Sequence, residues 1–139
     1  MSLKEEDRRI IVKMELEKAE RIFGEHELLR NGALWNTLAN RLYYVLFHAV
    51  SALLISEGHE VGTHKGAVIR FQQYFVKTKR YPVEDGRLYS QMQTMREYAD
   101  YNCSYDVSEE EVVERIEPIR RLIDKIKQDI ASKTERPNP

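Results

Sequence analysis

The segment from about Ala33 to about Glu57 constrains the fold more than any other part of the chain. Its apolar and aromatic side chains fall on nearly every side of a helix. A helix that is apolar all round must contact neighbours on several sides, so we expect this one to lie at the centre of a helical bundle. The residues that carry this pattern are Leu34, Trp35, Leu38, Leu42, Tyr43, Tyr44, Val45, Leu46, Phe47, Ala49, Leu53 and Leu54.

Apolar residues recur at helical spacing in four other segments, which predicts four more helices. With only 6 Gly and 4 Pro, the chain has few residues that end helices early. We therefore predict an all-α fold, an up-and-down bundle of four long helices plus a shorter one. The domain should cover residues 1–131, followed by a flexible tail over residues 132–139. The four segments are about Lys4–Gly24, His64–Lys77, Glu84–Asn102 and Ser108–Ile130.

Three local features refine these helices. Leu28 and Leu29 could prolong the first helix beyond Gly24. Ser108 followed by Glu111 is a capping box, in which each side chain satisfies a backbone N–H of the first turn. Pro118 lies inside the last apolar repeat, where its missing N–H should kink the helix.

Charge and cysteine content exclude several classes of protein. The net charge is -1 and the pI about 6.4, so any RNA contact must come from a local cluster of Arg and Lys. A single cysteine, Cys103, cannot form an internal disulfide and fits a reducing cytoplasm. The first residues are too charged for a signal peptide, and no apolar run approaches the ~20 residues of a membrane span. We expect a cytoplasmic protein without membrane contact.

Arg41, Tyr44 and His48 form the most concentrated group of functional side chains. They are spaced by three and four residues, so they share one stripe of the mostly buried central helix. A buried guanidinium is costly without a partner. Two interpretations remain open: an internal polar network with His48 as a satisfied core histidine, or a functional stripe that faces a cleft.

Two other segments carry polar groups of interest. Arg96 and Asp100 have the spacing of an intrahelical ion pair, and Asp100 could alternatively hold Arg41 across the bundle. Thr63 precedes His64 and Lys65 at a helix start, where backbone N–H groups bind anions. A merely capped helix start explains the same residues. No phosphate loop, metal-ligand spacing or nucleophile motif occurs, so we expect no metal and no cofactor.

Together these segments resemble the HEPN family. The resemblance rests on three motifs in order: R-x-Y-Y-x-x-F-H from Arg41 to His48, Thr63-His64-Lys65-Gly66 with the apolar residues after it, and R-x-x-A-D-Y from Arg96 to Tyr101. It implies a helical bundle that forms a homodimer. It also implies a toxin paired with a small nucleotidyltransferase antitoxin.

Active HEPN proteins are metal-independent ribonucleases with an R-x(4–6)-H motif near the end of the penultimate long helix. The His transfers a proton, and the Arg stabilises the charged phosphate at the dimer cleft. Here the corresponding stretch begins at Arg96 and has Tyr101 in place of the His; Arg41 and His48 fit the spacing on another helix.

Two functions follow from the resemblance, and the sequence does not settle whether the protein is an enzyme. The first is a module that binds RNA, a nucleotide or the nucleotidyltransferase without cleavage, through Arg41, Tyr44, His48, His64, Lys65, Arg96 and Asp100. The second is a ribonuclease toxin with catalytic residues Arg41, His48, Arg96 and Tyr101. A purely structural interaction protein is a third reading.

Overall fold

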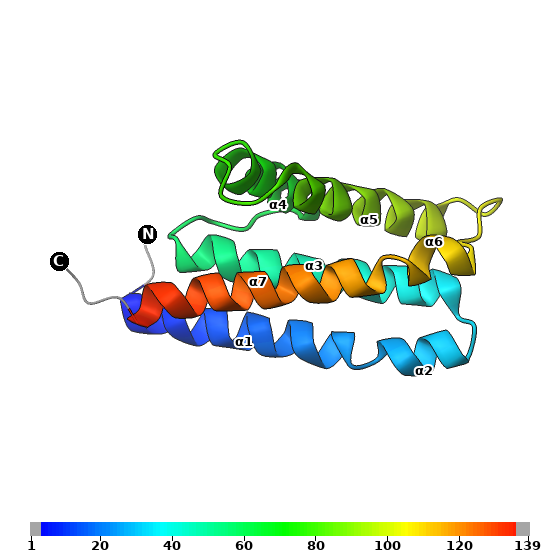
Figure 1. The fold of residues 1–139 in the computed structure, drawn as a ribbon, viewed down its shortest axis with the longest axis horizontal. Coiled ribbons are helices and arrows are strands. Elements are labelled where there is room, and N and C mark those ends of the chain that lie inside the picture. Colours follow the sequence, from blue (N-terminus) through cyan, green and yellow to red (C-terminus); the bar gives the residue numbers. More distant parts are fainter. Residues whose placement is uncertain (1–3, 136–139) are drawn as a thin grey trace.

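The computed structural model describes residues 4–135, and this part of the chain contains helices and no strand. Figure 1 shows long antiparallel helices in layers, with α1 below, α3 and α7 in the middle, and α4 and α5 above. The all-α bundle predicted from the sequence is confirmed. The long helices are α1 (Glu5–Phe23), α3 (Trp35–Ser56), α5 (Val83–Tyr101) and α7 (Ile116–Glu135). The short ones are α2 (His26–Asn31), α4 (His64–Phe71), the π-helical turn η1 (Gln72–Val76) and α6 (Glu109–Val113).

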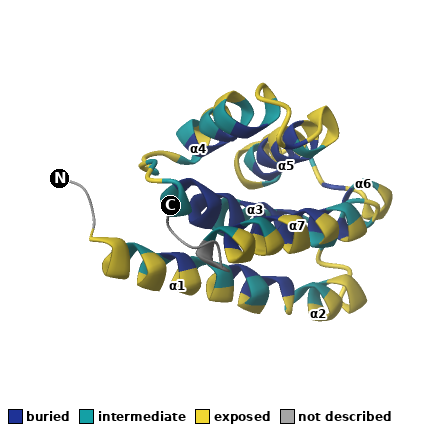
Figure 2. Cartoon of the chain, turned by 60° about the vertical axis from the view of Figure 1, so that its left-hand side comes forward, coloured by how far each residue is buried: buried dark blue, intermediate teal, exposed yellow. Residues whose placement is uncertain are grey.

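Helix α3 is the central helix, as its apolar pattern predicts. It packs against α1, α5 and α7 and also contacts α2, α4 and α6. Figure 2 shows it as the most deeply buried element, and twelve of its residues are buried. By length and composition α3 could cross a membrane, which corrects the expectation that no segment is apolar enough. Most of it is buried inside the bundle, as is usual for the core helix of a globular protein.

The first and last helical segments differ from their predicted extent. Leu28 and Leu29 lie in the separate helix α2, because the chain turns at Gly24 before helical structure resumes. The last segment divides into α6 and α7, which changes the role predicted for Pro118. Since α7 begins at Ile116, Pro118 lies in its first turn, where a backbone N–H has no helical partner to lose. The capping box of Ser108 and Glu111 is present as predicted.

The predicted tail begins inside helical structure, since α7 runs to Glu135. Residues 136–139 of that predicted tail lie outside the described residues.

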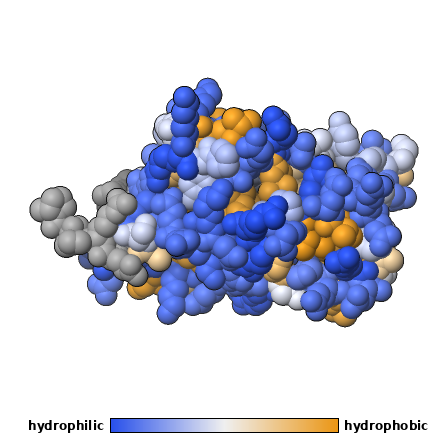
Figure 3. Space-filling model, in the orientation of Figure 1, coloured by the Kyte–Doolittle hydropathy of each residue, from blue (hydrophilic) through white to orange (hydrophobic). Residues whose placement is uncertain are grey.

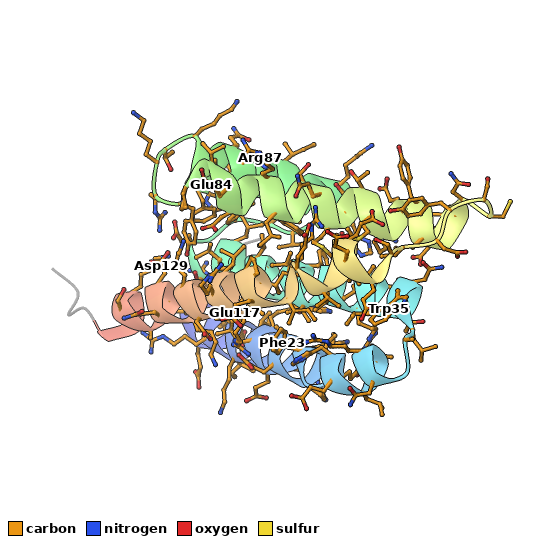
Figure 4. The ribbon with its side chains drawn as sticks, turned by 45° about the vertical axis from the view of Figure 1, so that its right-hand side comes forward. Phe23, Trp35, Glu84, Arg87, Glu117 and Asp129 are labelled. Carbon is orange, nitrogen blue, oxygen red and sulfur yellow. The ribbon has the colours of Figure 1, made fainter. Side chains whose placement is uncertain are left out.

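An ion-pair network fastens α1 to α7. Arg120 donates to Glu20 through Nη1, at 2.9 Å, and lies 4.8 Å above the ring of Phe23. Figure 4 shows Phe23 between these two helices. Lys127 also pairs with Glu20, at 3.1 Å. The hydrogen bond from Arg120 is the main reason that the pKa of Glu20 falls to about 2.

Helices α4 and α5 approach each other closely at η1. Gln72 donates from Nε2 to the carbonyl oxygen of Gly86, at 2.8 Å. A Cβ at position 86 would collide with the amide end of Gln72, so a larger residue there would have to displace this side chain and break its hydrogen bond. This contact fixes α4 beside α5 and places the start of α4 near the side chains described next.

Candidate anion-binding site on helices α3, α4 and α5

The stripe predicted on α3 is real, and it lies between two groups of helices. Arg41 and His48 contact carboxylates of the α1–α2 segment, while Tyr44 contacts α4 and α5. All three side chains are partly buried. The stripe is therefore the side of α3 that its neighbouring helices cover incompletely.

Arg41 is held by Glu25. The guanidinium makes two hydrogen bonds to this carboxylate, Nε to Oε1 at 2.9 Å and Nη2 to Oε2 at 3.2 Å. The hypothesis that Asp100 holds Arg41 is therefore wrong. Asp100 instead accepts a hydrogen bond from Asn40, at 2.9 Å, and pairs with Arg96. The turn after α1 decides this, because it brings Glu25 to the side of α3 that carries Arg41.

His48 is held by Glu15 of α1. Its Nδ1 lies 2.8 Å from Oε2 of Glu15. A carboxylate only accepts hydrogen bonds, so Nδ1 carries the proton and Nε2 is left for another partner. This arrangement orients the ring and presents Nε2, the nitrogen that could exchange a proton with a ligand.

Arg96 is the most deeply buried charged residue of the site, at 7% exposed. Its Cζ lies 4.7 Å from the ring centre of Tyr43 and 5.8 Å from that of Tyr44. Its only ion pair among the described residues is the one with Asp100, at 3.7 Å, and its Nε is buried without a hydrogen-bond partner there. A buried guanidinium with an unsatisfied donor is costly unless something else binds it.

His64 joins the same group from the first turn of α4. Its ring contacts Phe47 at 4.5 Å and Tyr44 at 5.5 Å between centres. Burial, and then the positive charge of Arg96, lower the pKa of His64 below its ordinary value. His64 is therefore a neutral imidazole at pH 7. We call His64, Arg96, Tyr43, Tyr44 and Phe47 the Arg96 cluster.

The start of α4 supplies donors beside this cluster. Thr63 caps the helix by accepting from the backbone N–H of Gly66, at 2.9 Å. The backbone N–H groups of the first turn and the exposed side chain of Lys65 add positive potential. This helix start and Arg96 lie in one neighbourhood, because His64 and Arg96 both contact the ring of Tyr44.

Tyr101 stands apart from the other predicted site residues. It is 78% exposed and makes no hydrogen bond, ion pair or ring contact with any described residue. Arg96 and Tyr101 are thus on the same helix but in different surroundings, one buried against α3 and the other in solvent. Tyr101 therefore does not lie beside Arg96, as a catalytic residue acting together with this arginine would have to.

Four participants were missed by the sequence analysis: Glu15, Glu25, Tyr43 and Phe47. The two glutamates come from other helices, and no spacing in the sequence indicates which carboxylate will face Arg41 or His48. Tyr43 could have been found from the sequence, because it directly precedes Tyr44 in the motif. In the structure its ring is the more buried of the two. Burial raises the pKa of Tyr43 to about 12, opposed by the charge of Arg96.

The chemistry available to this site is the binding of anions and the transfer of protons. Within residues 4–135 no three His, Cys, Asp or Glu side chains come together as metal ligands. Two imidazoles, a buried guanidinium and a helix start can bind a phosphate group by charge and hydrogen bonding.

Comparison with known proteins defines the class. The model of the HEPN domain family matches residues 12–129, which includes every site residue named above. The chain therefore belongs to the HEPN family.

Curated relatives agree with this assignment. The "UPF0332 protein" of Thermotoga maritima is 36% identical over 99 residues, covering 71% of this chain and 74% of the relative. Two proteins of Methanocaldococcus jannaschii carry the name "Putative toxin". One is 28% identical, covering 85% of this chain and 80% of the relative. The other is 29% identical and covers 81% and 83%.

Proposed function

We propose that this protein is a toxin-type HEPN module whose α3–α4–α5 face binds the phosphate groups of RNA or of a nucleotide. The phosphate lies between the start of α4 and the Arg96 cluster. Lys65 and the first-turn N–H groups contact it from one side and Arg96 from the other. The names of the two archaeal relatives support the toxin class, and the geometry of this face supports the ligand class.

The unsatisfied Nε of Arg96 carries the proposal. A guanidinium at this depth would ordinarily be fully paired, yet Arg96 has one long ion pair and two aromatic contacts. Phosphate oxygens are strong acceptors, and arginine binds them through several N–H groups at once. Displacement of Asp100, which pairs with Nη1 at 3.7 Å, would free that end of the guanidinium for such a ligand.

Binding without cleavage is the function we favour. Arg41 and His48, the pair with ribonuclease-like spacing, are each engaged by a carboxylate of the same chain. Repulsion from these two carboxylates disfavours phosphate binding at that point of the stripe.

A ribonuclease activity is the second candidate, and one observation favours it. His64 is kept neutral beside Arg96, and a neutral imidazole next to a guanidinium is the arrangement a general base needs at the ribose 2′-OH. In such a ribonuclease the general base would be His64 of α4, whereas the motif spacing indicates His48.

Two partners belong to the proposal. A second copy of the chain would cover the open side of α3 and form a homodimer, and a small nucleotidyltransferase would act as antitoxin. Both are expected of a HEPN toxin, as is a cytoplasmic location. Sedimentation of the purified chain measures the first, and co-purification with a nucleotidyltransferase encoded beside it measures the second.

The test of the phosphate site is a binding titration. Fluorescence anisotropy of a short labelled single-stranded RNA, repeated at several salt concentrations, should show binding that Arg96→Met weakens at least tenfold. Arg87→Met is the matched control, because Arg87 lies on the same helix, is exposed, and makes no ion pair or side-chain hydrogen bond with the described residues. If both variants bind like the wild type, or if the wild type binds neither RNA nor mononucleotide, the phosphate site is disproved.

The ribonuclease alternative is tested on the same preparations. End-labelled RNA is incubated in excess chelator with wild type, His64→Ala and His48→Ala, after matching their thermal stability. Cleavage that only His64→Ala abolishes would assign the base to α4. Cleavage by wild type that neither variant reduces would be a contaminant.

A further inference from the structure

The end of α5 and the segment that follows it have a composition opposite to that of the phosphate site. Residues 97–114 contain seven carboxylates, three tyrosines and no lysine or arginine. RNA binding depends on neutralising phosphates with cations, so this end of the bundle repels nucleic acid. It therefore needs a different explanation from the Arg96 cluster.

A groove of about 720 Å³ opens at the C-terminal end of α5. Two aromatic side chains stand in its wall largely uncovered, Tyr98 at 52% and Tyr101 at 78% exposed. Figure 3 shows that one face of the molecule is mostly hydrophilic with apolar patches. The two exposed rings lie on adjacent turns of α5. The lining consists of Arg96, Glu97, Tyr98, Tyr101, Asn102 and Cys103.

The groove is held in shape by Tyr105. Its ring meets that of Tyr98 edge to face, at 5.7 Å, and its hydroxyl donates to Glu111, at 2.7 Å. That hydrogen bond and burial raise the pKa of Tyr105 to about 12, so the link stays protonated at neutral pH. The end of α5 and the start of α6 are thereby joined into one surface.

Three carboxylates of this surface have no partner among the described residues. Asp100, Asp106, Glu111 and Glu114 are each engaged within the chain. By contrast Glu97, Glu109 and Glu110 make no ion pair or side-chain hydrogen bond with any described residue. An uncovered pair of tyrosine rings beside unpaired carboxylates matches the chemistry that recognises arginine and lysine, by charge and by cation–π contact.

We propose that this groove, which we call the tyrosine groove, docks a basic, arginine- or lysine-containing segment of a partner protein. A cationic side chain lies over the exposed ring of Tyr101, and Glu97, Glu109 and Glu110 provide the surrounding negative potential. Aromatic residues with little internal contact are the type that anchors protein interfaces. This interface borders the phosphate site, because Arg96 lines the groove as well, but its proposed contacts are those of Tyr101 and the three carboxylates and do not rest on the proposed function.

A peptide titration tests the tyrosine groove. The full chain is titrated with a short Arg–Gly repeat peptide, with an Asp–Gly repeat peptide and oligo(A) RNA as comparisons, and binding is followed by shifts of amide NMR signals. We expect the basic peptide alone to shift residues 97–111. Tyr101→Ala should weaken it about two- to fivefold, the range for an exposed cation–π contact, while Tyr101→Phe keeps the ring and binds like the wild type.

Charge variants separate the groove from general attraction to an acidic protein. Glu109→Gln with Glu110→Gln should weaken peptide binding at low salt, whereas Glu5→Gln with Glu6→Gln, in the first turn of α1, should not. Three results would overturn the proposal. The first is an equal loss of peptide affinity in both Glu→Gln double variants, and the second is NMR shifts spread over the whole surface. The third is wild-type affinity in Tyr101→Ala. Tyr101-dependent binding of oligo(A) instead would assign the groove to RNA. Arg96 borders both sites, so the tyrosine groove is judged only by peptide binding in the Tyr101 and glutamate variants, and the phosphate site only by RNA binding in Arg96→Met.

Discussion

Replacing Arg96 with Met removes the buried guanidinium and keeps an unbranched side chain of similar length. The loss comprises the aromatic contacts, about 1–2 kcal/mol for a desolvated cation–π pair, and a 3.7 Å ion pair worth about 0.5 kcal/mol. The gain is the relief of a buried N–H without a partner, about 1–3 kcal/mol. These nearly cancel, so Arg96→Met should change the free energy of unfolding by less than about 1 kcal/mol.

The decisive assay measures stability and binding on the same preparation. A change of about 1 kcal/mol moves the melting temperature of a domain of this size by about 3 °C, so thermal and urea unfolding should both be near wild type. RNA binding should fall at least tenfold at the same time. Figure 4 shows the control residue Arg87, which precedes Arg96 by nine residues on α5. A destabilisation above about 2 kcal/mol would refute the reasoning, since Arg96 would then be retained for the fold.

Two further predictions concern stability. The lowered pKa of Glu20 means that its ionised form stabilises the fold above the ordinary carboxyl pKa of 4.5, and that this stability is lost as the pH falls toward 2. Since the side chain is about one third exposed, Glu20→Gln should cost only about 1 kcal/mol in urea unfolding at pH 7. The cost should shrink at pH 3; an equal cost at both values would exclude the ion pair. Tyr81→Phe should lower the free energy of unfolding by about 1 kcal/mol, because the hydroxyl of Tyr81 donates to Asp129 at 2.8 Å. The same change at Tyr89, whose buried hydroxyl has no partner among the described residues, should be neutral or stabilising. An equal loss of stability from both Tyr→Phe substitutions would contradict this hydrogen-bond assignment.

A groove between α5 and α7 illustrates how surface features escape sequence analysis. Leu88 and Leu122 line it together with charged side chains of both helices, and the apolar patch between these helices is visible in Figure 3. Each helix alone has an ordinary amphipathic pattern. The groove exists because α5 and α7 both pack on α3 and barely touch each other.

Periodicity in the sequence determined the helices and the central place of α3. Apolar residues at helical spacing must be buried, and a helix that is apolar all round can be buried only at the centre of a bundle. The cap at Ser108 was equally predictable, because a capping box is a local interaction. The motifs from Arg41 to His48 and from Arg96 to Tyr101 were sufficient to indicate the HEPN family, which the family match over residues 12–129 confirms.

Tertiary structure alone decided the partners of the charged side chains. Arg41 could meet a carboxylate from any neighbouring helix, and only the turn after α1 selects Glu25. The opposite environments of Arg96 and Tyr101 follow from their directions around α5, one toward α3 and one toward solvent. Such pairings depend on the relative rotation and offset of packed helices. Those quantities are set by the fit of many side chains at once, and no local pattern in the sequence records them.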